Sequence, residues 1–165
     1  MMMRSLSNFT TRQWLVVAAL LFVLAGYAGN VSAARGLAGA KPFNLVVEEV
    51  DGVAKELGFS RTRLMGLVES ELKRSGIVPT VAGPRFLYLQ VIVKCLPSAP
   101  VCAASVEFEF NRLARIEDSF EAGVTVWDEE WVVVARKDLL REKVSKVLRE
   151  QGIPRFVRDY RKANP

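Results

Sequence analysis

The chain has 165 residues, with 23 Lys and Arg against 18 Asp and Glu, two cysteines and no histidine. This length fits one domain. The lack of histidine excludes Ser-His-Asp and Cys-His catalysis and the common zinc sites, because each needs an imidazole. Glycine-rich phosphate loops are also excluded, since the glycines match neither GxGxxG nor the P-loop pattern.

Residues 1–33 have the layout of a secretory signal peptide. Arg4 and Arg12 precede an apolar run over 14–25, and the small residues that follow end in Val31-Ser32-Ala33. This pattern predicts cleavage after Ala33 and an exported protein, periplasmic or extracellular. The alternative is an uncleaved membrane anchor, although the run falls short of the roughly 20 apolar residues that a bilayer needs. No cysteine follows the cleavage site, which argues against a lipid anchor.

The charge balance of the mature chain limits its partners. Cleavage removes two of the 23 basic side chains and none of the 18 acidic ones, so a small positive excess remains. That excess does not demand a nucleic acid, which would also be out of place outside the cytoplasm. We therefore expect no nucleic-acid partner, and either an envelope protein or an anionic envelope component.

The first part of the mature chain predicts a lead-in, a strand and a helix. Residues 34–43 are small and are expected to form a flexible lead-in to a single α+β domain over 44–165. The segment 44–50, NLVVEEV, predicts a short buried strand. A turn-prone stretch through Gly52 and Gly58 follows.

A helix is expected after Ser60, which is a candidate N-cap. Its apolar residues recur at helical spacing and are expected to face the core: Leu64, Leu67, Val68 and Leu72. Gly76 suits the left-handed position just after the helix, where Ile77 can contact Leu72.

The stretch 85–112 predicts two strands joined by a short proline-bearing loop, because apolar residues alternate with polar ones on both sides of it. With Cys95 opposite Cys102, every inward residue meets another: Val93 with Ala104, Val91 with Val106, Leu89 with Phe108, and Leu87 with Phe110. In an oxidising compartment these cysteines are expected to form a structural disulfide that contributes roughly 2–3 kcal/mol. A redox pair is the alternative, but CxxC spacing is absent. Direct opposition requires a non-hydrogen-bonded pair; otherwise the pairing is offset by one residue.

The segment 120–127 predicts a third strand, in a register that places Phe110 opposite Val126. Arg112 would then point inward, so we expect either a bulge or a position beyond the covered part of the sheet. The apolar stretch 131–135 could extend the sheet or dock under the last helix.

From Asp138 the pattern is helical, and Gly152 with Pro154 predicts a kink or a break. The outer side of this C-terminal helix is basic. It could make peripheral contact with a membrane or an anionic component, although a solvated helix exterior also explains it. Together the elements predict an α+β fold, with two helices on one face of a mainly antiparallel sheet of about four strands.

Residues for chemistry are scarce, and we expect no catalytic residue, no cofactor and no metal site. Glu107 with Glu109, and the turn 128–130, are explained by a solvated sheet face and a polar turn. Exposed aromatic and apolar side chains can anchor a partner, which gives one possible interaction surface: Tyr88, Ile92, Trp127 and Trp131.

The stretches LVES-ELKRSGI, RFLYLQVIV, VTVWD and the closing RFVRDYRKANP resemble a loose group of small exported bacterial proteins of unknown function. In architecture the chain also resembles the two-helix, antiparallel-sheet domains of cell-envelope proteins, such as the lipopolysaccharide-assembly lipoprotein and the amino-terminal domain of the Tol-system propeller protein. These resemblances imply a fold and no catalytic residues, and a shared fold does not fix function.

The sequence therefore predicts an exported, non-enzymatic cell-envelope domain that binds another protein or envelope component through its open sheet face or an edge strand. The alternative is a small-ligand-binding protein or a carboxylate-dependent enzyme, which requires a concave pocket with a buried acid.

Overall fold

The computed structural model describes residues 36–80, 83–116 and 120–165, so the expected signal peptide and its cleavage site lie outside the described residues. The elements follow in this order: β1 (Asn44–Val47), α2 (Gly52–Glu56), α3 (Arg61–Arg74), β2 (Arg85–Cys95), β3 (Val101–Ile116), β4 (Phe120–Arg136), α4 (Lys137–Val147), η1 (Leu148–Gly152) and α5 (Ile153–Ala163). Within the described ranges, no helix combines the length and the apolar character that crossing a membrane requires.

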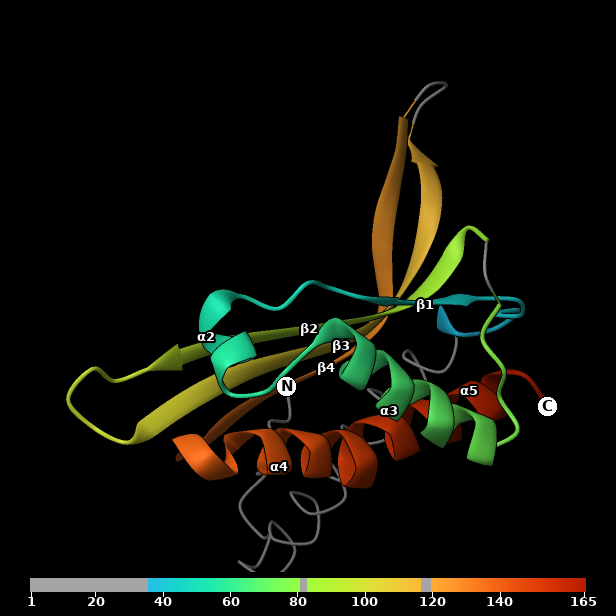
Figure 1. Cartoon of the computed structure of the whole chain (residues 1–165). Helices are drawn as coiled ribbons and strands as arrows, with labels where there is room; N and C mark the ends of the chain where they lie inside the picture. Colours follow the sequence, from blue (N-terminus) through green and yellow to red (C-terminus); the bar gives the residue numbers. More distant parts are fainter. Residues whose placement is uncertain (1–35, 81–82, 117–119) are drawn as a thin grey trace, which may run out of the picture.

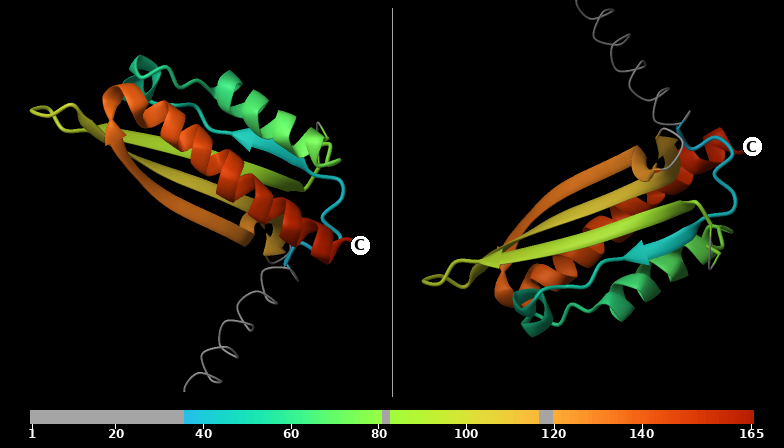
Figure 2. Two further views of the ribbon diagram at one scale, coloured as in Figure 1. Left: turned by 90° about the horizontal axis from the view of Figure 1, so that it is seen from below. Right: turned by 90° about the horizontal axis from the view of Figure 1, so that it is seen from above.

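The strands form one four-stranded sheet in the order β1-β2-β3-β4. β1 runs parallel to β2, and the other two pairs are antiparallel. α3 and the long helix α4-η1-α5 lie side by side on one face, which Figure 2 shows in front of the sheet on the left and behind it on the right. The predicted α+β fold is confirmed. The short helix α2 was not predicted; Asp51 caps it by accepting a hydrogen bond from the Ala54 amide at 2.7 Å.

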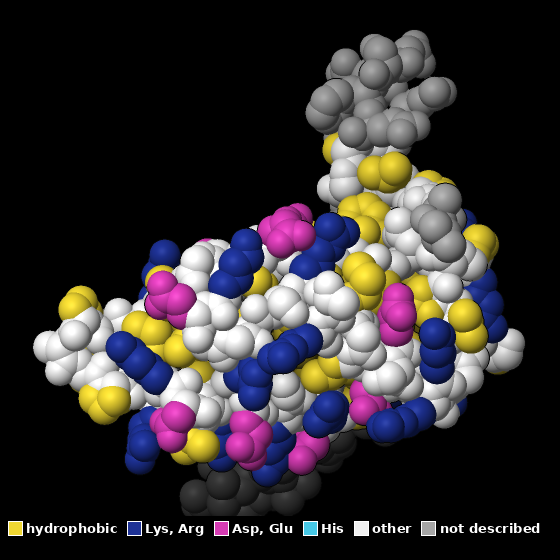
Figure 3. All heavy atoms as spheres, viewed as in Figure 1, with side chains coloured by type: hydrophobic (Ala, Val, Ile, Leu, Met, Phe, Trp, Pro, Cys, Tyr) yellow, Lys and Arg dark blue, Asp and Glu magenta, His cyan; other side chains and the backbone are white. Residues whose placement is uncertain are grey.

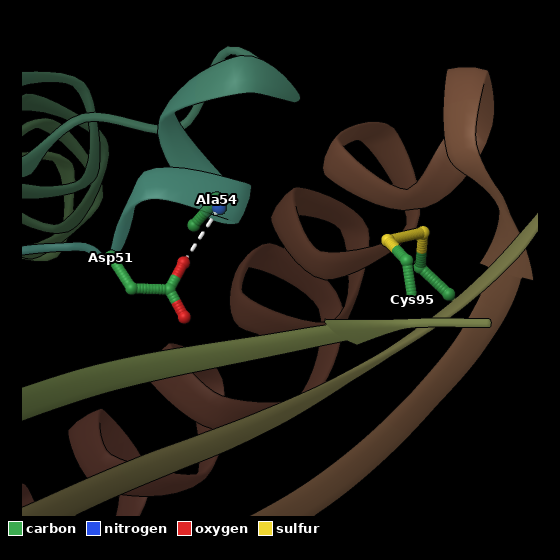
Figure 4. The surroundings of a disulfide bond; sticks show 4 residues. Asp51, Ala54 and Cys95 are labelled. Atoms are coloured by element: carbon green, nitrogen blue, oxygen red, sulfur yellow. Dashed lines mark hydrogen bonds between the residues drawn. A yellow bond between two sulfur atoms is a disulfide. The ribbon is translucent and has the colours of Figure 1, made fainter. Parts of the chain in front are cut away.

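The predicted β2–β3 register is confirmed from Cys95 opposite Cys102 to Leu87 opposite Phe110. The two cysteines form a disulfide with their Cα atoms 4.0 Å apart, at the end of the hairpin (Figure 4). The Leu96 amide donates to the Val101 carbonyl at 3.1 Å. Because hydrogen-bonded and non-hydrogen-bonded pairs alternate along an antiparallel ladder, the neighbouring cysteines occupy a non-hydrogen-bonded pair, and no offset is needed.

The third strand is present, but its predicted register is wrong. Phe110 lies opposite Trp127 and Asn111 lies opposite Thr125, so Val126 has no partner. A bulge was one of the two alternatives expected near Arg112, and the structure places its extra residue, Val126, in β4. Beyond Arg112, where the pairing with β2 ends, β3 and β4 continue as a two-stranded ribbon that rises away from the helices (Figure 1). The apolar stretch 131–135 continues β4, which confirms that it extends the sheet.

Both predicted ends of α3 are confirmed. The Ser60 hydroxyl accepts a hydrogen bond from the Arg63 amide at 3.3 Å. At the other end Gly76 has φ +70°, and the Ile77 amide donates to the Leu72 carbonyl at 2.9 Å. This is the Schellman pattern, in which a glycine reverses the chain and satisfies carbonyls that the helix leaves unpaired.

The predicted interruption near Gly152 is a bend and not a break, because the π-helical segment η1 joins α4 to α5. A Cβ atom at Gly152 would lie 2.9 Å from Cη2 of Trp131. Glycine therefore lets this helix pass close over β4.

An aromatic cluster fills the core between the sheet and α5. The ring of Phe156 contacts Trp127, Phe110 and Phe108 at centroid distances of 5.3, 5.9 and 6.1 Å. Edge-to-face and stacked contacts of this kind add to the stabilisation from burial alone. They fix α5 against β3 and β4, and so position the outer surface of the long helix.

The segment predicted as a flexible lead-in differs from that expectation over its described residues, 36–43. Leu37 and Ala40 are fully buried. The Asn164 side chain donates to the Leu37 carbonyl at 2.9 Å and accepts from the Ala40 amide at 3.2 Å. The small residues here serve close packing: a Cβ atom at Gly36 would lie 2.2 Å from the Val126 carbonyl oxygen.

Candidate functional site

The four residues predicted as an interaction surface do not form one surface. Trp127 is only 3% exposed and packs in the core, where its indole N–H donates to Asp159 at 3.2 Å. Trp131 is half-buried beneath Gly152 on the same helix-covered face. The unpaired Val126 shifts the alternation of β4 by one residue, which turns Trp127 inward. The prediction that Trp127 is exposed is therefore wrong.

Tyr88 and Ile92 remain on the open face of the sheet. Tyr88 is half-buried, and Ile92 is 41% exposed. Burial, followed by the negative charges of Glu48, Glu107 and Glu109, raises the pKa of Tyr88 to about 12. At physiological pH the phenol is therefore neutral, and its hydroxyl hydrogen-bonds with Glu48.

Carboxylates face one another across the open sheet face. Glu107 lies opposite Glu130, and Glu109 lies opposite Asp128. All four side chains are exposed or half-buried on the surface of the sheet. Like charges in directly opposed positions repel each other. These opposed pairs make this part of the open face acidic.

The helix side carries a groove that the sequence did not predict. It runs between α3 and the long helix, and its first part has a volume of about 500 Å³. Arginines from three elements line it: Arg63 on α3, Arg141 on α4 and Arg149 on η1. Hydroxyl groups of Ser60, Ser70 and Ser145 lie in the same lining, which contains no aspartate or glutamate.

Arg63 and Arg141 converge on one backbone position. The guanidinium of Arg63 donates to the Gly58 carbonyl at 3.1 Å. A Cβ atom at Gly58 would lie 2.7 Å from Nη1 of Arg141 and 3.7 Å from Nη1 of Arg63. Within the described part of the chain, neither of these arginines forms an ion pair. Two positive charges are therefore held together without a carboxylate to balance them.

The third arginine is only partly balanced. Nε of Arg149 lies 3.6 Å from Glu71, but the same carboxylate oxygen is 2.8 Å from Arg74. One negative charge is thus shared between two guanidinium groups. The first part of the groove consequently carries a net positive charge.

The groove continues along α5 with a different character. Arg149 also lines the second part, of about 490 Å³, whose floor includes the buried side chains Ile153 and Val157. Arg158 and Arg161 flank it. Arg158 is neutralised by Asp159 at 2.9 Å, whereas Arg161 donates to the Ser75 carbonyl at 2.6 Å. Figure 3 shows dark-blue Lys and Arg side chains across this helix side of the molecule, with magenta Asp and Glu side chains between them.

This arrangement is suited to binding anions. Guanidinium groups stay charged at any physiological pH and bind phosphate or carboxylate through paired hydrogen bonds. The hydroxyl groups can donate to the same oxygens, and the apolar floor of the second part can take hydrocarbon.

A sequence signal for the groove exists, although it does not distinguish a groove from a basic helix exterior that is solvated or touches a membrane. Arg141, Ser145 and Arg149 are spaced four residues apart, which places them along one line of a helix. What the sequence cannot give is the neighbour, because Arg63 joins them only when α3 packs beside α4.

Comparison with known proteins adds little. No family model and no curated protein matches the chain. Among solved structures the chain is similar to the rare lipoprotein B from Shewanella oneidensis, with 16% identity over 72% of this chain and 92% of that chain, at a TM-score of 0.28. A TM-score of this size does not establish a common fold, so fold and function rest on the geometry of this chain.

Proposed function

We propose that the protein is an exported, non-enzymatic cell-envelope domain that binds an anionic envelope component in the groove between α3 and α4-η1-α5. One observation carries the proposal: Arg63, Arg141 and Arg149 converge on a groove of about 500 Å³ whose lining contains no acidic side chain. Holding like charges together destabilises a fold unless a ligand or a counterion balances them.

Export is supported by two independent features of the chain. Residues 1–33 have the charge and apolar pattern of a signal peptide. Cys95 and Cys102 form a disulfide, which persists in oxidising compartments such as the periplasm.

The ligand class follows from the two parts of the groove. The arginines and serines of the first part suit a phosphate or carboxylate group. The floor that Ile153 and Val157 provide in the second part suits hydrocarbon next to that group. We therefore infer a phosphate-bearing lipid or glycolipid of the envelope as the ligand.

The test is binding of the disulfide-bonded mature chain, residues 34–165, to vesicles of neutral lipid with and without an anionic phospholipid. The double variant Arg63→Gln with Arg141→Gln removes two charges from the groove. The control double variant, Lys143→Gln with Lys162→Gln, removes two charges from exposed residues outside the groove linings described above. We expect at least a tenfold loss of affinity for the groove variant and less than a twofold loss for the control.

Peripheral membrane contact through the basic helix is the competing possibility. In that case both double variants should lose the same affinity for anionic vesicles, and added salt should weaken binding steeply. The reason is that such contact depends on the net charge and not on the position of each charged residue. Equal losses would therefore reject the groove as the binding site.

A further inference from the structure

The sheet has one long free edge. The strand β4 ends the order β1-β2-β3-β4 and is 17 residues long. Over residues 131–135, WVVVA, it contains neither a charge nor a proline. Val132 and Val134 are 70% and 65% exposed. Natural sheets protect such an edge with charged side chains, proline, a short strand or a covering segment, because it can pair with another strand.

No described segment covers this part of the edge. The residues near Gly36 reach β4 at Val126, which lies before the apolar stretch. α4 contacts the inner face of β4, not its outer edge (Figure 2). Residues 131–135 are therefore open to a partner strand.

We propose that a second copy of this chain pairs with β4, antiparallel and centred on Val133, so that the two sheets become one continuous sheet. This register places Val132 opposite Val134 of the second copy, and Trp131 opposite Ala135. Side chains alternate between the two faces of a strand, so even-numbered residues of both copies share the open face. The four exposed valines then form one apolar cluster.

Charge complementarity selects this register and this partner. In the same register Glu130 lies opposite Arg136 of the second copy, and Arg136 lies opposite Glu130. Both residues are exposed, and within one chain Glu130 faces the like charge of Glu107. The incoming arginine balances that repulsion. Within one chain Arg136 forms an exposed ion pair with Asp138 at 3.1 Å. Such exposed pairs contribute little stability, so Arg136 can give up this contact to pair with Glu130 of the second copy.

The neighbouring two-fold registers lose this match. Centring on Val132 places Glu130 opposite Val134. Centring on Val134 places Arg136 opposite Val132 and Glu130 opposite Asp138. In the register centred on Val133, the same strand supplies both the glutamate and the arginine of each charged pair. This self-complementarity is typical of a closed two-fold dimer and favours a second copy over an unrelated partner. The interface lies at the sheet edge, away from the groove, so this inference goes beyond the proposed function and does not depend on it.

The test is the mass in solution of the disulfide-bonded mature chain, residues 34–165, measured by light scattering and sedimentation over a range of concentrations. We expect a monomer–dimer equilibrium. The substitution Glu130→Arg should weaken dimerisation at least tenfold, because it places two arginines opposite each other. The double variant Glu130→Arg with Arg136→Glu should restore the dimer.

The control is Ile92→Lys, which places a charge on the same open face but on the inner strand β2, where Ile92 is 41% exposed. It should leave the dimer intact, and circular dichroism should show that every variant keeps its fold. A monomer at all concentrations would overturn the proposal. Dissociation by Ile92→Lys without an effect of Glu130→Arg would also overturn it, because it would move the contact from the edge to the face.

Discussion

The two faces of the sheet share strands but differ in what covers them. On one face every alternate side chain from Leu87 to Cys95 and from Cys102 to Phe110 is apolar and packs beneath α3 and α4-η1-α5, which carry an arginine-lined groove on their outer side. None of the described helices covers the other face, where opposed carboxylates and exposed valines meet water. Because side chains alternate along each strand, one face of the sheet forms the core and the opposite face stays accessible to other molecules. Substitutions on the two faces should therefore differ sharply in effect.

The largest contrast is expected between Phe156 and Ile92. The substitution Phe156→Ala removes a fully buried ring that contacts Phe108, Phe110 and Trp127, so it should lower the free energy of unfolding by about 3–5 kcal/mol. The substitution Ile92→Ala on the open face should cost less than about 1 kcal/mol. Urea unfolding followed by circular dichroism measures both. Equal losses would contradict the assignment of the two faces.

The disulfide comes next, because it joins two inward positions at the end of the hairpin. The double variant Cys95→Ala with Cys102→Ala should lose about 2–3 kcal/mol, since the open loop restores entropy to the unfolded chain. The wild-type chain unfolded in a reducing agent is the matched control, and it should lose a similar amount. Two free thiols in the untreated protein would contradict this prediction.

Alanine substitutions at two glycines should have opposite effects on stability, because one glycine packs against the sheet and the other lies on the outer side of the helix layer. The substitution Gly152→Ala brings a Cβ atom within 2.9 Å of Trp131, and it should destabilise the fold by about 1 kcal/mol. At Gly66, in the middle of α3, nothing lies within 4 Å of an added Cβ atom. The substitution Gly66→Ala should therefore stabilise by about 0.5–1 kcal/mol, through helix propensity. In thermal unfolding, Gly152→Ala should lower the melting temperature and Gly66→Ala should raise it. A melting temperature that Gly152→Ala leaves unchanged would contradict the close packing of η1 on β4.

The smallest effect concerns the open face at high pH. The pKa of Tyr88 is raised to about 12 in the folded chain, whereas a free tyrosine titrates near 10. The neutral phenol therefore contributes stability that is fully present below about pH 10 and is lost as the pH rises toward 12. Burial also raises the pKa of Tyr160. Absorbance at 295 nm should therefore show late tyrosine titration whose amplitude falls in Tyr88→Phe, leaving the contribution of Tyr160. A normal titration of Tyr88 would contradict the acidic surroundings of this residue.

The sequence predicted what depends on local pattern. The β2–β3 register followed from alternation and the two cysteines, and the ends of α3 followed from Ser60 and Gly76. Prediction from the sequence failed where one extra residue shifted the alternation of a strand, and where the packing of distant segments determined which residues lie together. The unpaired Val126 turned Trp127 inward, and no composition rule signals that position. The small residues near Leu37 predict flexibility, but in the structure they pack closely, and the Asn164 side chain donates to the Leu37 carbonyl. The groove joins residues of α3 and α4, so only their packing reveals it.

The central claim is that an anion binds on the helix side and not on the open face. Its most direct test follows the backbone amide signals of the isotope-labelled chain over residues 34–165 by NMR, while a short-chain anionic phospholipid is added below its micelle concentration. The account predicts shifts centred on Arg63, Arg141 and Arg149, with Tyr88 and Ile92 unchanged. Shifts centred on the open face, or none at concentrations that saturate vesicle binding, would contradict it.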